Sequence, residues 1–391
     1  MEKLQFHFDQ LLRSTTTEFH RYLSHEINWR NRMIGIVGPR GVGKTTLVLQ
    51  HIKEELDRST SLYVIAEDIY FSTHNLVDLA DAFVRMGGQH LFIDEIHKYN
   101  GWSRELKLIH DYHPNLNVVF TGSSVLDIVE GISDLSRRAM VYHLHGMSFR
   151  EYLMMRNGIE LPVYTLDSIL NNSVELPQGF LPLMHFAQYI KRGYYPFTIL
   201  NDDYDILINQ IVNVTLENDI PQYANLTIAT ARKFKKLLSI IAQSSPFKPN
   251  FTQIGGQISV SRNQVADMCS MIERSGLIAQ LRESTKSILA LGKVDKIYLD
   301  NTVLINSLGD PHTDIGTIRE TFFFNQVRVK HDICSSPVSD FLVDEKYTFE
   351  VGGKSKKQRQ IKGVENAFVV KDDIETGYAN VIPLWMFGLM Y

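Results

Sequence analysis

The stretch MIGIVGPRGVGKTTLVLQHIKEEL, residues 33 to 56, decides the fold. It begins with an apolar run and ends with apolar residues at helical spacing. Between them stands the pattern G-x-x-x-x-G-K-[ST], which is typical of a loop that binds phosphate groups. We therefore predict a strand, a phosphate-binding loop and a helix, in that order. The residues expected to contact the phosphates are Gly38, Pro39, Arg40, Gly41, Val42, Gly43, Lys44, Thr45 and Thr46.

Each residue type in this loop has a chemical reason. Glycines allow backbone N–H groups to close around phosphate oxygens, and the N-terminus of the following helix adds its positive dipole end. Lys44 is expected to neutralise the β- and γ-phosphates, and the Thr45 hydroxyl is expected to bind Mg²⁺. The loop therefore predicts ATP and Mg²⁺ as cofactors.

An acidic pair follows a second apolar segment. Residues 91–93 are typical of a buried strand, and Asp94 and Glu95 come directly after it. The carboxyl end of such a strand lies at the edge of a parallel sheet where ligands bind. We expect Asp94 to hold the Mg²⁺ sphere and Glu95 to orient or polarise the attacking water. A metal ion beside two adjacent carboxylates relieves their repulsion.

Further apolar segments at 62–65, 118–120 and 140–144 are strand candidates, and helical stretches such as 76–85 and 102–110 separate them. Alternating strands and helices indicate a parallel sheet wrapped by helices. The sequence therefore predicts an α/β fold, with a P-loop NTPase sheet in its first part.

Two further groups are candidates for contact with the γ-phosphate. Thr121 and Ser123 follow the strand at 118–120, where a polar side chain can sense that phosphate, although helix capping explains them equally well. Arg137 and Arg138 follow a polar loop, and an arginine there can act as a finger on a neighbouring subunit. A pair of solvated surface arginines is the competing interpretation.

The second part of the chain changes character. Residues 149–155, 181–191 and 204–216 have helical patterns and are interpreted as a helical lid. Three helices and a hairpin then follow in the order of a winged helix-turn-helix, and a last region combines a helix with short strands. The expected winged-helix segments are 232–242, 252–257, 261–274, 277–281 and 288–291. The expected segments of the last region are 315–329, 341–343, 348–351, 367–370 and 381–386.

Bulk composition narrows the class of protein. A chain of 391 residues with 44% hydrophobic and 21% charged residues is typical of a packed protein of several domains. The formal net charge of -4 gives no global attraction to nucleic acid. Two cysteines make no disulfide framework, and no apolar run approaches the roughly 20 residues of a membrane-spanning helix. The default expectation is a cytoplasmic protein with no membrane partner.

Several motifs together resemble a known family: GPRGVGKTT at 38–46, LFIDEIHKY at 91–99, FTGSS at 120–124, MSFREY at 147–152 and FEVGGK at 349–354. They are similar to those of prokaryotic AAA-type ATPases whose C-terminal part joins a winged helix to a restriction-endonuclease-like domain. The resemblance implies an ATPase core at 1–145, a helical lid at 146–229, a winged helix at 230–300 and a small α/β domain at 301–391. It also places the finger candidate at Arg138, whereas Arg137 stands where glycine is frequent, and the choice between them stays open.

The same resemblance implies a possible nuclease site in the last domain. Such folds gather carboxylates around a divalent metal beside an activating lysine. The matching residues are Glu320, Asp340, Glu350, Lys354 and Gln360. The chain departs from the pattern at Gly352, where the lysine is expected, and Lys354 can replace it only if the strand bends.

These observations support three hypotheses. The first is an Mg²⁺-dependent ATPase that moves its C-terminal modules, with DNA as the expected object and a homo-oligomer as the setting for an arginine finger in trans. The second is a nucleotide-dependent switch that binds a protein partner and hydrolyses ATP slowly. The third adds ATP-regulated DNA cleavage at the last domain. In the expected helix at 261–274, the outward residues Arg262, Asn263, Gln264 and Asp267 include only one cation, which favours a protein-contact or lid-like role as much as DNA contact.

Overall fold

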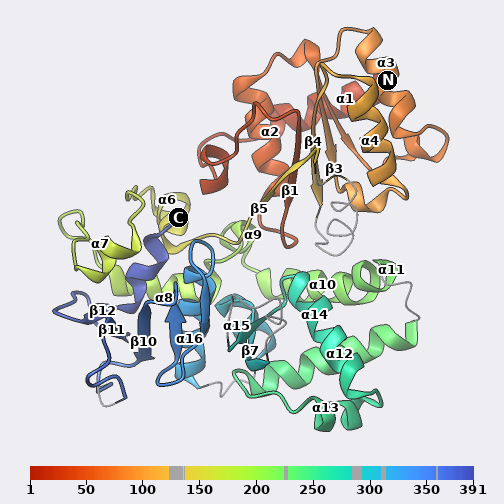
Figure 1. Cartoon of the computed structure of the whole chain (residues 1–391). Helices are drawn as coiled ribbons and strands as arrows, with labels where there is room; N and C mark the ends of the chain where they lie inside the picture. Colours follow the sequence, from red (N-terminus) through yellow and green to blue (C-terminus); the bar gives the residue numbers. More distant parts are fainter. Residues whose placement is uncertain (123–134, 136, 224–227, 284–292, 310–313, 358–359) are drawn as a thin grey trace. The chain divides into compact units, whose positions relative to one another are not determined.

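The computed structural model describes residues 1–122, 135, 137–223, 228–283, 293–309, 314–357 and 360–391. Their contacts divide the chain into two compact units, Met1–His145 and Gly146–Tyr391 (Figure 1). The first unit contains the phosphate-binding motif and the acidic pair. The second contains the helical regions and the small α/β region.

The first unit is built on a five-stranded sheet with the order β2-β3-β4-β1-β5. All its neighbouring strands pair in parallel, as the alternation of strands and helices predicted. The α/β fold class is therefore confirmed. The strands are β1 (Met33–Val37), β2 (Ser61–Ile65), β3 (His90–Asp94), β4 (Asn117–Gly122) and β5 (Met140–His143).

Helices cover both faces of this sheet (Figure 1). Two of them pack over one face, where strand residues such as Leu91 and Val118 join helix residues such as Leu79 and Leu106 in one core. The helix that follows the phosphate loop covers the opposite face. The helices are α1 (Glu2–Ser14), α2 (Lys44–Glu55), α3 (Leu76–Arg85) and α4 (Trp102–Tyr112), with short 3-10 turns at Tyr22–His25, Arg58–Thr60, Ile69–Ser72 and Ile96–Lys98.

Strand register brings three polar side chains to the face that α2 covers. Side chains alternate along a strand, and paired residues of a parallel sheet point to the same face. Phe92 pairs with both Tyr63 and Val119, so these three share a face. Asp94 lies two residues after Phe92, and Thr121 lies two residues after Val119. Tyr63, Asp94 and Thr121 therefore point to the α2 side.

The second unit begins with helices. The first of them, α6 (Phe149–Asn157), starts with a capping box in which Ser148 and Glu151 bond each other's backbone N–H groups. The remaining helices before the first hairpin are α7 (Leu166–Leu170), α8 (Pro182–Arg192), α9 (Pro196–Leu200), α10 (Tyr204–Val214), a π-helical turn (Thr215–Asp219), α11 (Ile220–Tyr223), α12 (Ile228–Ser244), α13 (Phe251–Ile258) and α14 (Arg262–Arg274).

An antiparallel pair, β6 (Ile278–Arg282) and β7 (Val294–Leu299), follows these helices. A second five-stranded sheet then has the order β12-β11-β10-β9-β8, with parallel pairing on the β10 to β12 side and antiparallel pairing on the β8 to β10 side. Its elements are α15 (Thr302–Leu308), α16 (Ile315–Val327), β8 (Ile333–Ser335), β9 (Phe341–Val343), β10 (Tyr347–Gly352), β11 (Ala367–Lys371), β12 (Val381–Pro383) and a 3-10 helix (Leu384–Leu389).

Two predicted strands of this unit need correction. The segment 288–291 lies outside the described residues, and the strand that pairs with β6 is β7, in which Ile297 and Leu299 are buried. The predicted strand 381–386 ends at Pro383, because proline fixes φ and has no N–H for the ladder, and a 3-10 helix continues from it. The short elements β8 and α15 were not predicted.

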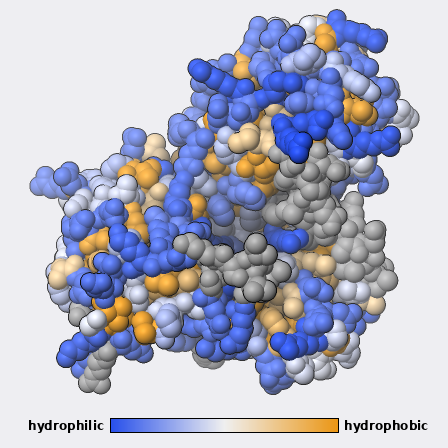
Figure 2. All heavy atoms as spheres, viewed as in Figure 1, coloured by the Kyte–Doolittle hydropathy of each residue, from blue (hydrophilic) through white to orange (hydrophobic). Residues whose placement is uncertain are grey.

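In the described parts of the chain, no helix is both long enough and apolar enough to cross a membrane. The face drawn in Figure 2 is mainly hydrophilic, with small apolar patches between polar side chains. Scattered exposed apolar residues of this kind are normal on a protein surface.

Candidate nucleotide-binding site

Two glycines give the loop between β1 and α2 its shape. Gly43, the N-cap of α2, has a φ of 97°, a left-handed conformation that suits glycine. A Cβ atom at Gly38 would come within 2.2 Å of the Leu144 carbonyl oxygen, so the backbone there approaches the end of β5 too closely for any side chain. The Lys44 ammonium donates hydrogen bonds to the carbonyl oxygens of Gly38 and Pro39, both at 2.9 Å. The loop therefore curls around the lysine head.

Asp94 lies at the centre of a hydroxyl network beside this loop. Its Oδ2 accepts hydrogen bonds from the Thr45 hydroxyl at 2.7 Å and from the Tyr63 hydroxyl at 2.5 Å. Its Oδ1 accepts a hydrogen bond from the Thr121 hydroxyl, whose oxygen in turn accepts one from the Glu95 backbone N–H at 3.2 Å. Asp94 is only 4% exposed, and hydrogen bonds to a buried carboxylate offset the cost of removing it from water.

Glu95 follows in a left-handed backbone conformation, with a φ of 53°, which is uncommon for a residue with a side chain. Its carboxylate lies 3.9 Å from the Arg40 guanidinium in the phosphate loop and 3.5 Å from the His97 imidazole. Glu95 is thus placed next to the loop rather than in the sheet core. His97 was not predicted as a site residue, although it lies in the stretch LFIDEIHKY at 91–99.

Arg21 is a second residue that sequence reasoning missed. It is 4% exposed, and its guanidinium donates hydrogen bonds to the carbonyl oxygens of Val42 in the loop and His145 after β5, the latter at 2.7 Å. The segment before β1 therefore supports the loop from outside. A lone arginine in the loop-like stretch TTTEFHR gave no signal for this role.

The donor set at this edge of the sheet fits the predicted cofactors. A hydroxyl and a carboxylate side by side supply the oxygen ligands that Mg²⁺ prefers, and Lys44 supplies the cation that phosphates require. The loop leads through Gly43 directly into the N-terminus of α2, and helix N-termini favour bound anions. Thr45 and Asp94 would hold Mg²⁺, and residues 38–46 would hold the phosphates.

The remaining candidates of this unit have mixed outcomes. Thr121 joins the network around Asp94, whereas Ser123 lies outside the described residues. Arg138 donates two hydrogen bonds of 3.0 Å to the Asp111 carboxylate, and Arg137 is exposed. The hydrogen bond with Asp111 raises the pKa of Arg138 further, so this cation is permanent. The finger role of either arginine stays a prediction.

The predicted nuclease-like residues gather in the second unit. The ammonium of Lys296, from β7, lies 2.9 Å from a Glu320 carboxylate oxygen and 3.8 Å from one of Asp340. The Tyr298 hydroxyl also donates to Glu320, at 2.8 Å. Burial and the neighbouring Glu320 raise the pKa of Asp340 to about 6. Glu320 and Asp340 therefore share one lysine, which the sequence gave no reason to place there.

Glu350 completes this cluster with a different lysine from the predicted one. The Lys356 ammonium lies 2.6 Å from a Glu350 oxygen, while Lys354 is exposed. A Cβ atom on Gly352 would come within 2.6 Å of the Lys356 side chain, so Lys356 occupies the space that a side chain at 352 would enter. With the side-chain amide of Gln360 oriented so that its nitrogen faces Glu350, this nitrogen donates to Oε1 at 2.6 Å and to Oε2 at 2.5 Å.

This cluster does not fit a metal ion as it stands. Across the described residues, no group of three or more His, Cys, Asp or Glu side chains is arranged to hold one. Two lysine ammonium groups already pair with the three carboxylates. Ammonium groups can neutralise carboxylates in place of a metal ion. The cluster is therefore an ion-pair junction between β7, α16 and β10, in which two ammonium groups face three carboxylates.

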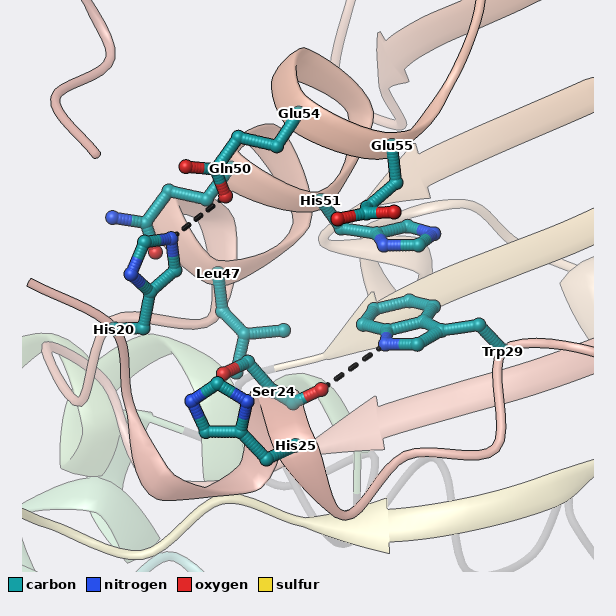
Figure 3. A pocket seen from close by; sticks show the side chains of 9 residues that line it. All are labelled: His20, Ser24, His25, Trp29, Leu47, Gln50, His51, Glu54 and Glu55. Atoms are coloured by element: carbon teal, nitrogen blue, oxygen red, sulfur yellow. Dashed lines mark hydrogen bonds and ion pairs between the residues drawn. The ribbon is translucent and has the colours of Figure 1, made fainter.

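A cavity of about 540 Å³ lies between α2 and the segment at residues 20–29 (Figure 3). Trp29 stacks on His51 with ring centroids 3.7 Å apart, and His20 contacts the Glu54 carboxylate at 2.8 Å. Gln50 ties this segment to α2 through hydrogen bonds to the carbonyl oxygens of Thr16 and Phe19. The cavity walls thus hold the segment that carries Arg21 against α2.

The first unit has the α/β fold with a five-stranded parallel sheet that P-loop NTPases share. In agreement, residues 30–153 match a family described as an AAA domain, and residues 183–314 match a domain of unknown function. An uncharacterized protein of Methanocaldococcus jannaschii is 23% identical over 299 residues, which cover 72% of this chain. The chain spans 61% of the length of that relative.

Solved structures with some similarity include three proteins. A katanin structure described for its self-assembly has a TM-score of 0.27 and 19% identity, covering 44% of this chain and 62% of its own. The structure of C. elegans PCH-2 has a TM-score of 0.26 and 15% sequence identity, and the match covers 70% of this chain and 66% of PCH-2. The structure of AMPPCP-bound DnaA from Aquifex aeolicus has a TM-score of 0.30 and 13% sequence identity, and the match covers 68% of this chain and 85% of the DnaA chain. Scores this low carry no argument about function, and the winged-helix and restriction-endonuclease-like assignments stay predictions.

The cavity beside α2 gives a pH prediction. Burial, with a smaller effect of His90, lowers the pKa of His51 from 6.5 to about 4. The folded state therefore prefers neutral His51, so the stability that depends on it is complete above about pH 6.5 and is lost as the pH falls toward 4. In thermal melts over this range, Tm should fall less steeply for His51→Phe, which keeps a ring on Trp29, than for the wild type.

His25→Phe is the matched control, because His25 lines the same cavity and is exposed. Its Tm should follow the wild type at each pH. Identical slopes for the wild type and His51→Phe would show that His51 has no part in the acid sensitivity.

Proposed function

We propose that this chain is an Mg²⁺-dependent ATPase of the AAA type. The observation that carries the proposal is the 2.7 Å contact between the Thr45 hydroxyl and the Asp94 carboxylate, beside the Lys44 ammonium. A phosphate loop, a magnesium-binding hydroxyl and an acidic strand end are the parts that P-loop hydrolysis needs. The AAA-domain match at residues 30–153 supports the same conclusion.

Each residue has a defined task in this proposal. Thr45 and Asp94 would hold Mg²⁺, which would supply positive charge to the phosphates. Lys44 adds a second cation, and the loop amides orient the triphosphate. Glu95 orients or polarises the attacking water, and its place next to Arg40 sets it beside the loop. Thr121 and Ser123 remain the candidates for sensing the γ-phosphate.

Hydrolysis is proposed to drive movement of the second unit, with DNA as the expected object. The support is the order of elements there, since α12, α13 and α14 followed by the β6–β7 hairpin have the order of a winged helix. The alternative is a nucleotide-dependent switch that binds a protein partner. It is favoured by the small number of exposed cations on α14, which are Arg262 in its first turn and Arg274 in its last.

DNA cleavage by the second unit is an additional hypothesis with less support than ATP hydrolysis. Its support is that Glu320 and Asp340 share Lys296, and that Lys356 pairs with Glu350 beside Gly352, where the resemblance leads us to expect a lysine. The carboxylates are nevertheless paired with lysines, so a divalent metal has to displace at least one ammonium group first. We therefore expect ATP hydrolysis rather than nuclease activity as the main reaction.

Two substitutions test the ATPase proposal. Lys44→Ala removes the phosphate cation and should weaken ATP binding by about 100-fold or more in calorimetric titration. Glu95→Gln should keep ATP binding and slow turnover by about 100-fold or more, because only the water-polarising group is lost. Lys53→Ala, on the exposed side of α2, is the control for Lys44. Unaltered turnover in Glu95→Gln would remove that residue from the mechanism.

DNA dependence separates the coupling hypotheses. ATPase rates should rise with at least one of plasmid, duplex or branched DNA, and the stimulation should fall steeply with salt because phosphate contacts release counterions. Turnover that ignores every DNA form would favour the protein-binding switch. Cleavage is read from the same tubes, and equal amounts of product with wild type and Glu350→Ala would exclude a nuclease at the cluster.

The finger proposal requires neighbouring subunits. Arg138→Ala should reduce kcat by at least about 10-fold without weakening ATP binding, because a finger acts on the transition state. Mixing Arg138→Ala with Lys44→Ala subunits should restore part of the turnover if the arginine acts in trans. Arg137→Ala is measured beside it to decide between the two arginines.

Asp111→Asn is the matched control, because it breaks the same ion pair and keeps the Arg138 cation. Full activity of Arg138→Ala, or activity in a strict monomer equal to that of an oligomer, would make Arg138 a surface residue.

A further inference from the structure

Tyr63 is a buried polar residue that no motif of the site explains. It lies on β2, next to the strand that ends in the acidic pair, and it is 2% exposed. Its hydroxyl donates a 2.5 Å hydrogen bond to Oδ2 of Asp94, the same oxygen that accepts the Thr45 hydroxyl at 2.7 Å. Tyr63 thus bonds the oxygen that faces the proposed magnesium ligand.

The direction of this hydrogen bond is fixed. The Tyr63 hydroxyl has Oδ2 of Asp94 as its acceptor at 2.5 Å, and a phenol carries a proton at neutral pH. A neutral phenol can only donate to a carboxylate that has no proton to give. Tyr63 is therefore a permanent donor, and Oδ2 is held between two hydroxyl hydrogens.

We propose that Tyr63 is a positioning residue of the nucleotide site, whose hydroxyl fixes the rotation of the Asp94 carboxylate so that Asp94 and Thr45 present their oxygens to Mg²⁺ together. The inference rests on the proposed ATPase function and goes beyond it by assigning a role to a residue outside the sequence motifs. The Thr121 hydroxyl donates to Oδ1 of Asp94, so hydrogen bonds fix both oxygens of the carboxylate.

Packing alone does not account for a tyrosine here. A buried hydroxyl costs free energy unless it is hydrogen-bonded, and phenylalanine would fill the same space without that cost. The ring is already placed by apolar contact, because Phe8 of α1 stacks beside it with ring centroids 6.4 Å apart and an angle of 25°. Phe8 itself is fully buried. The ring therefore belongs to the core, and the hydroxyl is directed at the carboxylate.

The arrangement also connects α1 to the site. Phe8 sets the position of the Tyr63 ring, the ring sets the position of its hydroxyl, and the hydroxyl sets Asp94. A change in how α1 packs would therefore reach the metal-binding carboxylate through one aromatic contact. The nucleotide itself is held by other groups, namely the loop amides and Lys44.

The test is Tyr63→Phe in the full chain, which keeps the ring and removes only the hydroxyl. Mn²⁺ binding to the ADP-bound protein, measured by electron paramagnetic resonance, should weaken by about 10-fold, in line with the loss of one hydrogen bond to a charged group. ADP binding without metal should stay within about 2-fold, because the hydroxyl does not act on the loop. The Mg²⁺ concentration for half-maximal ATPase rate should rise in parallel.

Tyr99→Phe is the matched control. The Tyr99 hydroxyl donates to the Glu105 carboxylate at 2.9 Å in the same unit, so the variant loses an equivalent hydrogen bond elsewhere. Its Mn²⁺ affinity should equal that of the wild type. Phe8→Leu is the second variant, because it loosens the ring but keeps the hydroxyl, and it should weaken Mn²⁺ binding in the same direction by a smaller factor.

Unchanged Mn²⁺ affinity in Tyr63→Phe would overturn the inference, and so would an equal loss in Tyr99→Phe. Should Tyr63→Phe not fold, unchanged Mn²⁺ affinity in folded Phe8→Leu would overturn it instead. The metal-binding readout is independent of hydrolysis. A wild type that binds Mn²⁺ and ADP but never turns over ATP therefore contradicts the proposed function while the role of Tyr63 is still decided.

Discussion

The nucleotide site depends on a single buried carboxylate, that of Asp94. Three hydroxyl groups donate to it, and they come from three different elements: Thr45 from α2, Tyr63 from β2 and Thr121 from β4. A charge that is 4% exposed is costly unless such donors surround it. The parallel register of β2, β3 and β4 is what brings these donors to one face, so fold and site depend on each other.

The second unit handles buried charge in another way. Its three gathered carboxylates meet ammonium groups, with Lys296 on Glu320 and Asp340 and Lys356 on Glu350. Pairing of this kind joins a hairpin strand, a helix and a sheet strand without a bound ion. The two sites differ in the charge of their donors, because neutral hydroxyl groups surround Asp94 whereas ammonium groups neutralise the carboxylates of the second unit.

Much of the first unit could be predicted from local pattern. The strand ending at Val37, the loop to Thr45 and the acidic end of β3 each carry their signal within a few neighbouring residues. The second unit was less predictable because its signals are not local. The partner of β6 was placed too early in the chain, and Lys356 was passed over for Lys354, since only a folded turn shows which lysine comes back over Gly352.

The sequence by itself determined the phosphate loop, its helix and the acidic strand end, because a tight glycine turn, a helix N-terminus and alternating burial depend on short-range chain geometry. Only the tertiary structure decided which distant side chains complete the site. Arg21 and Tyr63 have no distinctive neighbours in the chain, and His97 lies in the stretch LFIDEIHKY but was not singled out. Chain folding brings Arg21 to the loop, and strand register brings Tyr63 to Asp94, whereas His97 meets Glu95 two residues away through a local turn.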